Sequence, residues 1–200
     1  MDKQSRSPKE KRAYTQSVRA ENRAELHRAL AKAAFELHDT VGPSKTTVTA
    51  IAQRAGVQRL TVYRHFPDDA AIFAACTAYS FEHDPPPSPE VWRAIGDPVE
   101  RLRAALQDVY GYYGRKTQLL SNLYRDADLP VVAAALERRQ QVLESGVDIL
   151  ASGWPRPSKT LRATLGHVLD FASWRSLTQG QGLDMNGAIR LAMDFVASQL

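Results

Sequence analysis

Apolar residues recur along most of this chain at intervals of three and four, which is the spacing of amphipathic helices. The first such stripe falls between residues 20 and 38 and consists of Leu26, Leu30, Ala33 and Leu37. Nowhere do β-branched residues alternate with polar ones as they do in a half-buried strand. The pattern therefore predicts an all-α chain whose first helix covers about residues 20–38.

Proline and glycine clusters mark the ends of the other expected helices. Asp68 is placed to cap a fourth helix that continues to about Phe81, and Pro85–Pro89 then interrupts the helical pattern. The later helices are expected over residues 98–115, 130–151, 158–178 and 184–199, with a short one around 119–125.

The stretch Thr46–Phe66 predicts two short helices joined by a tight corner. Apolar residues at i, i+3, i+4 and i+7 from Val48 form one face of the first helix. Gly56 follows where that helix would end in a left-handed cap, a conformation that glycine adopts without strain. Val62 and Phe66 are the inward positions of the second helix. This pattern is typical of a DNA-reading helix-turn-helix.

These residues also carry a family resemblance. Thr46-Thr-Val, Ile51-Ala, Ala55-Gly-Val and Thr61-Val-Tyr-Arg-His-Phe-Pro67 resemble the N-terminal domain of tetracycline-repressor-type (TetR-family) transcriptional regulators, and the specific match covers roughly residues 20–80. The resemblance implies a three-helix DNA-binding domain followed by a helical bundle that binds an effector and dimerises. We therefore expect a flexible basic arm over residues 1–19, the helix-turn-helix domain over 20–67 and the effector-binding and dimerisation domain over 68–200.

Several outward positions of the corner could contact DNA. Arg59 and Arg64 are placed to read guanine, because an arginine fork can bind its O6 and N7 together. Gln58 could contact adenine, Leu60 a thymine methyl group, and Lys45 a phosphate.

The resemblance adds contacts that position the protein on the duplex. It implies that Thr47, Thr61, Tyr63 and His65 hold phosphates or the groove edge, and Thr46 belongs to the same expected set. The chain also departs from the family, since Asp69 stands where relatives usually carry lysine. An acidic residue there suits a helix N-terminus but removes one phosphate contact.

Charge is unevenly divided along the chain. Residues 1–66 carry 13 Lys and Arg against 6 Asp and Glu, a net charge of +7, whereas residues 67–200 carry 13 against 16, a net charge of −3. A basic front on a mildly acidic body suits a DNA-binding head joined to a domain with another task.

Composition and motifs exclude several other classes. The single Cys76 rules out an internal disulfide and cysteine-rich zinc modules, and no apolar run is long enough for a membrane span. No Walker loop, zinc-protease, nucleophile-elbow or dinucleotide-binding motif occurs. We therefore expect a cytoplasmic protein that is not an enzyme, with no catalytic residues, cofactor, metal site or membrane partner.

The resemblance further implies a small-molecule pocket among the helices of the body. Aromatic side chains with a polar group are suited to line such a pocket. The candidates are Trp92, Tyr110, Tyr113, Tyr124, His167, Phe171 and Trp174.

The last two expected helices, over residues 158–178 and 184–199, are apolar enough to pack against a second copy as a four-helix interface. A homodimer would place two recognition helices about 34 Å apart, or a multiple of that, on a near-palindromic operator. The sequence thus favours a ligand-responsive regulator, most readily a repressor. An all-α ligand-binding or interaction protein with a degenerate head, and a small helical enzyme, remain as alternatives.

Overall fold

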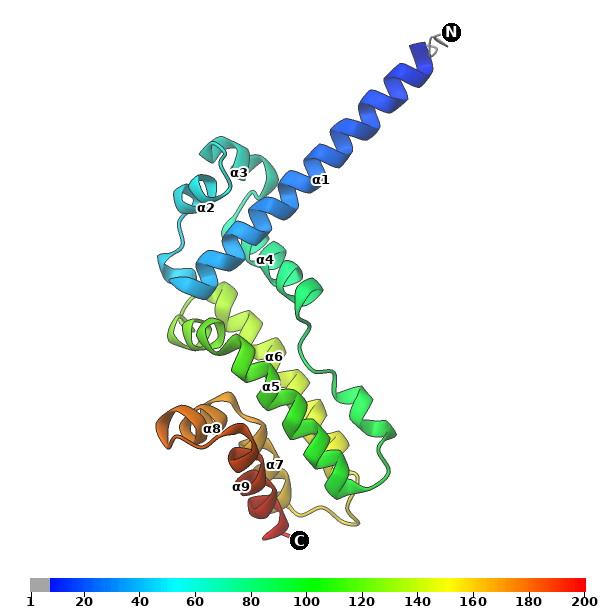
Figure 1. Ribbon diagram of the computed structural model, residues 1–200, viewed down its shortest axis with the longest axis vertical. Helices are drawn as coiled ribbons and strands as arrows, with labels where there is room; N and C mark the ends of the chain where they lie inside the picture. The colour runs from blue at the N-terminus through cyan, green and yellow to red at the C-terminus, as the bar shows by residue number, and fades with distance from the viewer. Residues whose placement is uncertain (1–7) are drawn as a thin grey trace. The chain divides into compact units, whose positions relative to one another are not determined.

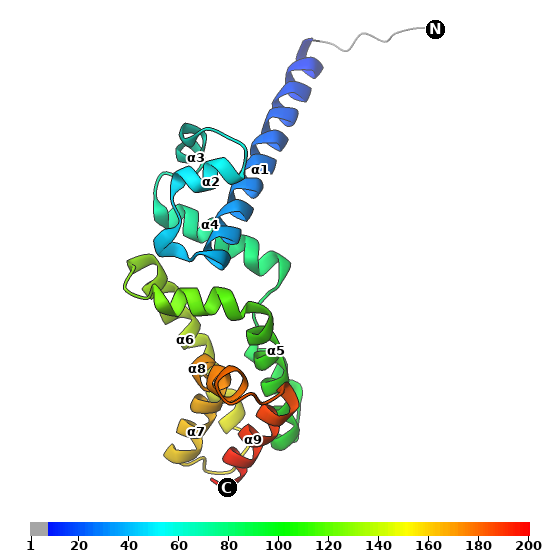
Figure 2. The same cartoon turned by 60° about the vertical axis from the view of Figure 1, so that its left-hand side comes forward.

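The computed structural model describes residues 8–200, with backbone only for residues 8–15. Every regular element in this range is helical, in agreement with the expected all-α class. The helices form two compact units (Figures 1 and 2). The first comprises the chain up to Val41 together with Lys45–His83, and the second comprises Gly42–Ser44 and Asp84–Leu200. Within the described range, no helix is both long enough and apolar enough to cross a bilayer.

Helix α1 (Pro8–Thr40) begins earlier than the sequence pattern predicts. The expected flexible arm is therefore corrected from Pro8 onward, while residues 1–7 lie outside the described range. Proline is tolerated in the first turn of a helix, and no glycine or further proline follows before Thr40. The apolar stripe was a poor guide here because it records where a helix packs, and this helix continues beyond its packed part.

The first unit is completed by three further helices, α2 (Val48–Arg54), α3 (Arg59–His65) and α4 (Asp69–His83). Its core contains Leu30, Ile51, Val62 and Phe66, with Cys76 from α4. The predicted cap of α4 forms, since Asp68 Oδ1 accepts a 2.7 Å hydrogen bond from the Ala71 amide. Because α4 packs along α1, the first unit extends to His83, beyond the boundary expected after Pro67.

The second unit is a bundle of longer helices. Helices α5 (Pro98–Arg125) and α6 (Pro130–Ala151) pack together, and the short η2 (Pro89–Ala94) lies against both. The chain then forms α7 (Lys159–Leu169), α8 (Phe171–Arg175), η3 (Ser176–Gly180) and α9 (Met185–Ala197) (Figure 1). The short turn η1 (Pro43–Lys45) follows α1.

Helix α5 is kinked where the sequence predicts a gap between two helices. Lys116 has non-helical backbone angles, φ −109° and ψ 17°, inside the otherwise continuous helix. Asp84 forms ion pairs with two residues at the kink: its carboxylate lies 3.0 Å from Arg115 Nη2 and 3.3 Å from Lys116 Nζ. The segments 98–115 and 119–125 are thus parts of one bent helix.

The helix expected over residues 158–178 is broken at Asp170. This residue has extended backbone angles, ends α7 and caps α8 through its carboxylate, which accepts from the Ala172 amide. Two buried tyrosines of α5 donate hydrogen bonds to carbonyl groups at the end of α7. The Tyr110 hydroxyl donates to Val168 O, and the Tyr113 hydroxyl donates to Leu169 O. The break depends on these long-range hydrogen bonds, so the local pattern of α7 and α8 could not reveal it.

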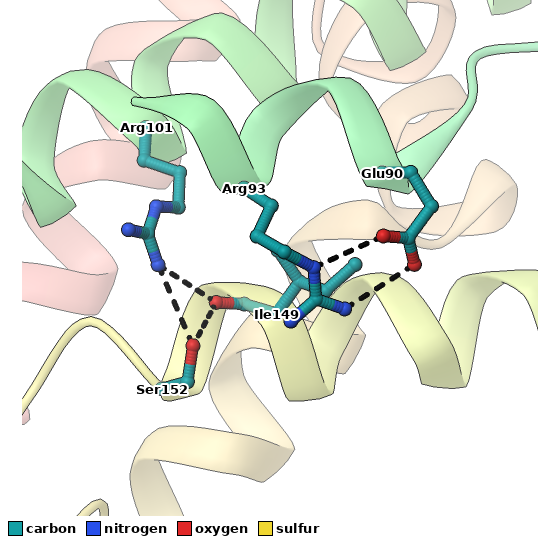
Figure 3. A network of polar contacts seen from close by, with 5 residues as sticks. All are labelled: Glu90, Arg93, Arg101, Ile149 and Ser152. Atoms are coloured by element: carbon teal, nitrogen blue, oxygen red, sulfur yellow. Dashed lines mark hydrogen bonds and ion pairs between the residues drawn. The ribbon is translucent and has the colours of Figure 1, made fainter. Parts of the chain in front are cut away.

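A buried arginine fastens α5 to the end of α6. Arg101 donates from Nη1 to Ile149 O at 3.0 Å and approaches Ser152 Oγ at 3.5 Å (Figure 3). The neighbouring pair of Glu90 and Arg93 is exposed and links residues of one turn in η2. Arg101 therefore has a structural role, with backbone oxygen atoms satisfying its donors.

Candidate nucleic-acid interface and buried aromatic cluster

The corner between α2 and α3 is built by local backbone chemistry. Thr47 caps α2 by accepting a 3.1 Å hydrogen bond from the Ala50 amide. Gly56 then adopts a positive φ of 69°, which reverses the chain, and the Val57 amide returns to Ala52 O at 2.9 Å. Gly56 thus forms the turn where the sequence pattern predicts it.

The outer face of α3 is polar, basic and accessible. Its predicted inward residues, Val62 and Phe66, are buried, as expected. Thr61 and His65 are half-buried at the edges of this face. The exposed residues at the start and along the helix are Gln58, Arg59, Leu60, Tyr63 and Arg64. Leu60 has 59% of its surface exposed.

The basic groups of this face are not neutralised within the described chain. Arg54, on the other side of α2, pairs with Glu36 of α1 at 3.1 Å. Lys45, Arg59 and Arg64 form no ion pair with any described carboxylate; Arg59 makes only a long 3.4 Å hydrogen bond to the Tyr63 hydroxyl. A surface that leaves its cations unpaired is suited to bind phosphates and base edges.

Before α2, Lys45 and Thr47 are exposed and Thr46 is half-buried. The Thr47 oxygen serves as the helix cap, so only its hydroxyl hydrogen is available to a phosphate. Asp69 begins α4 as expected and is exposed.

Helix α1 contributes to this interface in a way that the sequence patterns missed. The His27 ring lies 5.8 Å from the His65 ring and 4.7 Å from that of Phe66. Burial, followed by the charges of His27 and Arg23, lowers the pKa of His65. Arg23 and His27 are one turn apart on a polar stretch of α1, so the sequence carried no signal beyond that i, i+4 spacing.

The second unit brings together four of the seven predicted pocket residues. Tyr113 of α5 contacts Phe171 and Trp174 of α8 edge-on, with ring centroids 5.4 and 5.6 Å apart. Tyr124 stacks on Phe171 at 5.5 Å with the ring planes only 9° apart. We call these four residues, Tyr113, Tyr124, Phe171 and Trp174, the aromatic cluster.

The other three candidates lie elsewhere or serve the core. Trp92 donates its Nε1 hydrogen to Asp108 at 2.9 Å and belongs to the packing of η2. Tyr110 is fully buried beside Tyr113 and donates its hydroxyl hydrogen to the end of α7. His167 is exposed on α7, 6.0 Å from the Phe195 ring.

Arg139 of α6 joins the aromatic cluster although it was not a sequence candidate. Its Nη2 donates a 2.6 Å hydrogen bond to the Tyr113 hydroxyl, and its guanidinium lies 5.0 Å from the centre of that ring. A signal was present in the sequence: Arg139 interrupts an apolar stripe that includes Val132, Leu143 and Leu150. A charged residue at an inward position needs a polar or oppositely charged partner, which is either another residue or a ligand.

An open groove of about 430 Å³ runs between α6 and α7, with Leu143, Val147 and Gly166 in its lining. An ion pair between Asp148 and Arg162 lies at this groove. The described residues contain no group of three or more side chains suited to hold a metal ion.

Residues 30–76 match the model of the bacterial regulatory proteins of the tetR family. This range includes the last third of α1, where its buried residues lie, the whole corner and the first half of α4. No curated protein sequence matches the chain.

Solved regulators share the fold of nearly the whole chain. NalD from Pseudomonas aeruginosa, the secondary repressor of the MexAB-OprM multidrug efflux pump, is 20% identical with a TM-score of 0.66, covering 90% of this chain and 98% of its own. FadR from Bacillus subtilis, solved with stearoyl-CoA, is 16% identical with a TM-score of 0.62, covering 86% and 98%. A TetR-like regulator from Rhodococcus sp. RHA1 is 20% identical with a TM-score of 0.61, covering 86% and 93%. Residues 30–76 thus resemble the tetR family of bacterial regulatory proteins, and nearly the whole chain shares the fold of solved TetR-type regulators.

Proposed function

We propose that this protein is a homodimeric, sequence-specific transcriptional repressor that a small-molecule effector releases from a near-palindromic operator. The observation that supports this most is the outer face of α3, where Arg59 and Arg64 are exposed and unpaired beside a helix-turn-helix corner. Lys45 adds a third cation without an ion-pair partner among the described carboxylates. A protein with this task acts on DNA in the cytoplasm.

The dimer is supported by an apolar surface on α9. Ile189, Ala192 and Val196 of this helix are buried within the unit, whereas Leu191 and Phe195 are 48% and 47% exposed. The two exposed residues are four apart and therefore share one face. A second copy packing here would cover both, and a twofold axis would pair the recognition helices on one side of the duplex.

Release requires the effector to be coupled to the DNA-binding unit. An effector against Tyr113 would bind three residues before Lys116, where α5 is kinked and paired with Asp84. Asp84 follows His83, the last residue of α4. A shift of the kink would therefore act on the end of α4. A hundredfold loss of operator affinity needs a coupling free energy of about 2.7 kcal/mol.

Two solved relatives support effector binding and repression in general terms. FadR was solved with stearoyl-CoA, and NalD is a repressor of an efflux pump. Their sequence identities are too low to transfer either ligand or operator, and the nature of the effector has to be argued from this chain's own side chains.

The test is a DNase footprint and a gel shift with purified protein on the DNA flanking its own gene. We expect saturable protection of a near-palindromic site, with an affinity that falls steeply as the salt concentration rises. A protein that gives no saturable protection, or binds all sequences equally, is no operator-binding regulator. In that case the helix-turn-helix would serve as an interaction module instead.

A further inference from the structure

Arg139 is a half-buried cation without an ion-pair partner among the described carboxylates. Its Nη2 hydrogen bonds to the Tyr113 hydroxyl, and the Tyr124 phenol also lies within its hydrogen-bonding reach. Its Nε is buried and has no hydrogen-bond partner. No described carboxylate forms an ion pair with it, and burial raises the pKa of Tyr113, so this phenol stays neutral. The positive charge is thus uncompensated.

The buried cations of the second unit have oxygen partners. Arg101 donates to the carbonyls of Ile95 and Ile149 at 2.8 and 3.0 Å, and Lys116 lies 3.3 Å from the Asp84 carboxylate. A buried charge is costly unless it is paired or fully hydrogen-bonded. The incomplete coordination of Arg139 is therefore a specific feature of the aromatic cluster.

A second donor in the same cluster is also unsatisfied. Trp174 is only 4% exposed, yet its Nε1 hydrogen has no acceptor. Trp92, equally buried, donates to Asp108. Arg139 and Trp174 both lie against the Tyr113 ring, at 5.0 and 5.6 Å from its centre. Both missing partners are hydrogen-bond acceptors, which points to one acceptor-rich ligand.

The charge and shape of the surroundings restrict this ligand further. One unpaired guanidinium matches one negative charge, and its planar fork suits a carboxylate. Arg175, 5.6 Å from the Phe171 ring, adds positive potential to the same cluster. Tyr124 stacks on the buried Phe171 ring and is itself 38% exposed, so it offers a flat apolar surface that is reachable from solvent.

We propose that Arg139 binds the anionic group of an effector that is a small monocarboxylate with a flat apolar body, and that the Trp174 indole N–H is the second donor to it. The apolar body lies against Tyr124, whose ring stacks on Phe171. This inference rests on the proposed ligand-responsive function and names the chemical class of its effector.

The first test compares the half-buried Arg139 with the buried Arg101 by thermal unfolding. Arg139→Met removes an uncompensated charge and should leave Tm unchanged or raised. Arg101→Met, the matched control, leaves the carbonyls of Ile95 and Ile149 without their donor and should lower Tm by several degrees. If Arg139→Met lowers Tm as much as Arg101→Met does, Arg139 is a structural residue and the proposal is overturned.

The second test measures binding of 3-phenylpropanoate and 2-naphthoate by calorimetry, each against its carboxamide and against phenyl phosphate. At least one carboxylate should bind saturably, its amide at least tenfold more weakly, and Arg139→Met should lose at least tenfold for the carboxylate but not for the amide. The proposal fails if neither carboxylate binds, if an amide binds as tightly as its acid, or if Arg139→Met binds normally. Tighter binding of phenyl phosphate would overturn the assignment to a carboxylate.

A nuclear magnetic resonance readout tests the second donor. In protein with ¹⁵N-labelled tryptophan, the carboxylate should shift the Trp174 indole N–H signal, assigned by its loss in Trp174→Phe, and leave that of Trp92 in place. A shift of the Trp92 signal alone would contradict the proposed site. Operator binding by the ligand-free protein is measured separately. Footprinting without carboxylate binding would overturn this inference alone, and carboxylate binding without footprinting would overturn the proposed function alone.

Discussion

The arginines of this protein can be sorted by their partners: some form ion pairs or hydrogen bonds within the fold, and others lack such partners. Arg54 is paired with Glu36 on the back of α2, whereas Arg59 and Arg64 on α3 are exposed without such a partner. The same contrast distinguishes Arg101 from Arg139 inside the second unit. All of these residues are arginines, so the role of each follows from the oxygen atoms that the fold brings near its guanidinium group.

At this scale, Arg64→Ala and Lys45→Ala should affect DNA binding differently. Arg64 faces the base edges in our proposal, and its loss should cost about 1–3 kcal/mol of discrimination at one operator position. Lys45→Ala should weaken binding to all sequences alike and reduce the salt slope by about one. Gel shifts with operator variants over a range of salt measure both effects. Equal losses of specificity in the two variants would contradict this division of contacts.

Asp126 should make stability depend on pH. Its carboxylate accepts from the Ser44 amide at 3.0 Å and pairs with Arg125 at 2.9 Å, and the Arg125 hydrogen bond is the main cause that lowers the pKa of Asp126 to about 2. A lowered carboxyl pKa stabilises the folded state above the unfolded value near 4, and this contribution is lost as the pH falls through about 2.

Asp126→Asn should therefore lower the free energy of unfolding by about 2 kcal/mol at pH 7, the size of a hydrogen bond to a charged group. Urea unfolding from pH 7 down to pH 3 should show the difference from wild type shrinking below pH 4. Glu137→Gln, at an exposed position, is the control. A difference that stays constant with pH would mean that the ionised carboxylate is not the stabilising group.

At the scale of elements, local chemistry and distant contacts set different helix ends. The α2–α3 corner is determined by the Thr47 cap and by Gly56, both of which are legible in the sequence. At the end of α7, by contrast, the local cap Asp170 is joined by the hydroxyls of Tyr110 and Tyr113, which donate to carbonyls 58 and 56 residues away in the chain.

Gly56→Ala tests the corner. Gly56 has φ +69°, and a Cβ there would meet no atom within 4 Å, so the substitution adds conformational strain without a clash. We expect a loss of about 1 kcal/mol in the free energy of unfolding. Gly96→Ala is the matched control, because a Cβ there also meets nothing within 4 Å and the backbone has no positive φ. Chemical denaturation of both should show a loss in Gly56→Ala only; equal stabilities would mean that the turn relaxes.

At the scale of the whole molecule, the proposed function needs two copies of the chain. A single recognition helix buries too little surface for specific, tight binding. The exposed pair of Leu191 and Phe195 on α9 is the surface that a second copy would cover.

The double substitution Leu191→Glu with Phe195→Glu should convert a dimer into a monomer at micromolar concentration, because it places like charges on both sides of a twofold contact. It should also weaken operator binding at least a hundredfold. Val91→Glu, at a residue that is 60% exposed on η2, should change neither property. Analytical ultracentrifugation and gel shifts measure the two effects. A wild-type protein that is monomeric at this concentration would rule out the proposed assembly.

The sequence by itself determined the features that depend on neighbours along the chain. The all-α class, the α2–α3 corner and the cap at Asp68 follow from periodicity, caps and glycine, which act within one or two turns. The true start of α1 was missed, because an unpacked helix has no apolar stripe to mark it.

Only the tertiary structure decided which distant residues meet. Tyr124 and Phe171 stack although 47 positions separate them in the sequence, and Arg139 joins them from a third helix. Periodicity identifies a residue's own buried face but carries no information about the partner across the interface. For that reason the basic outer face of α3 could be named from the sequence, while Arg139, the residue we assign to the effector, required the packed bundle.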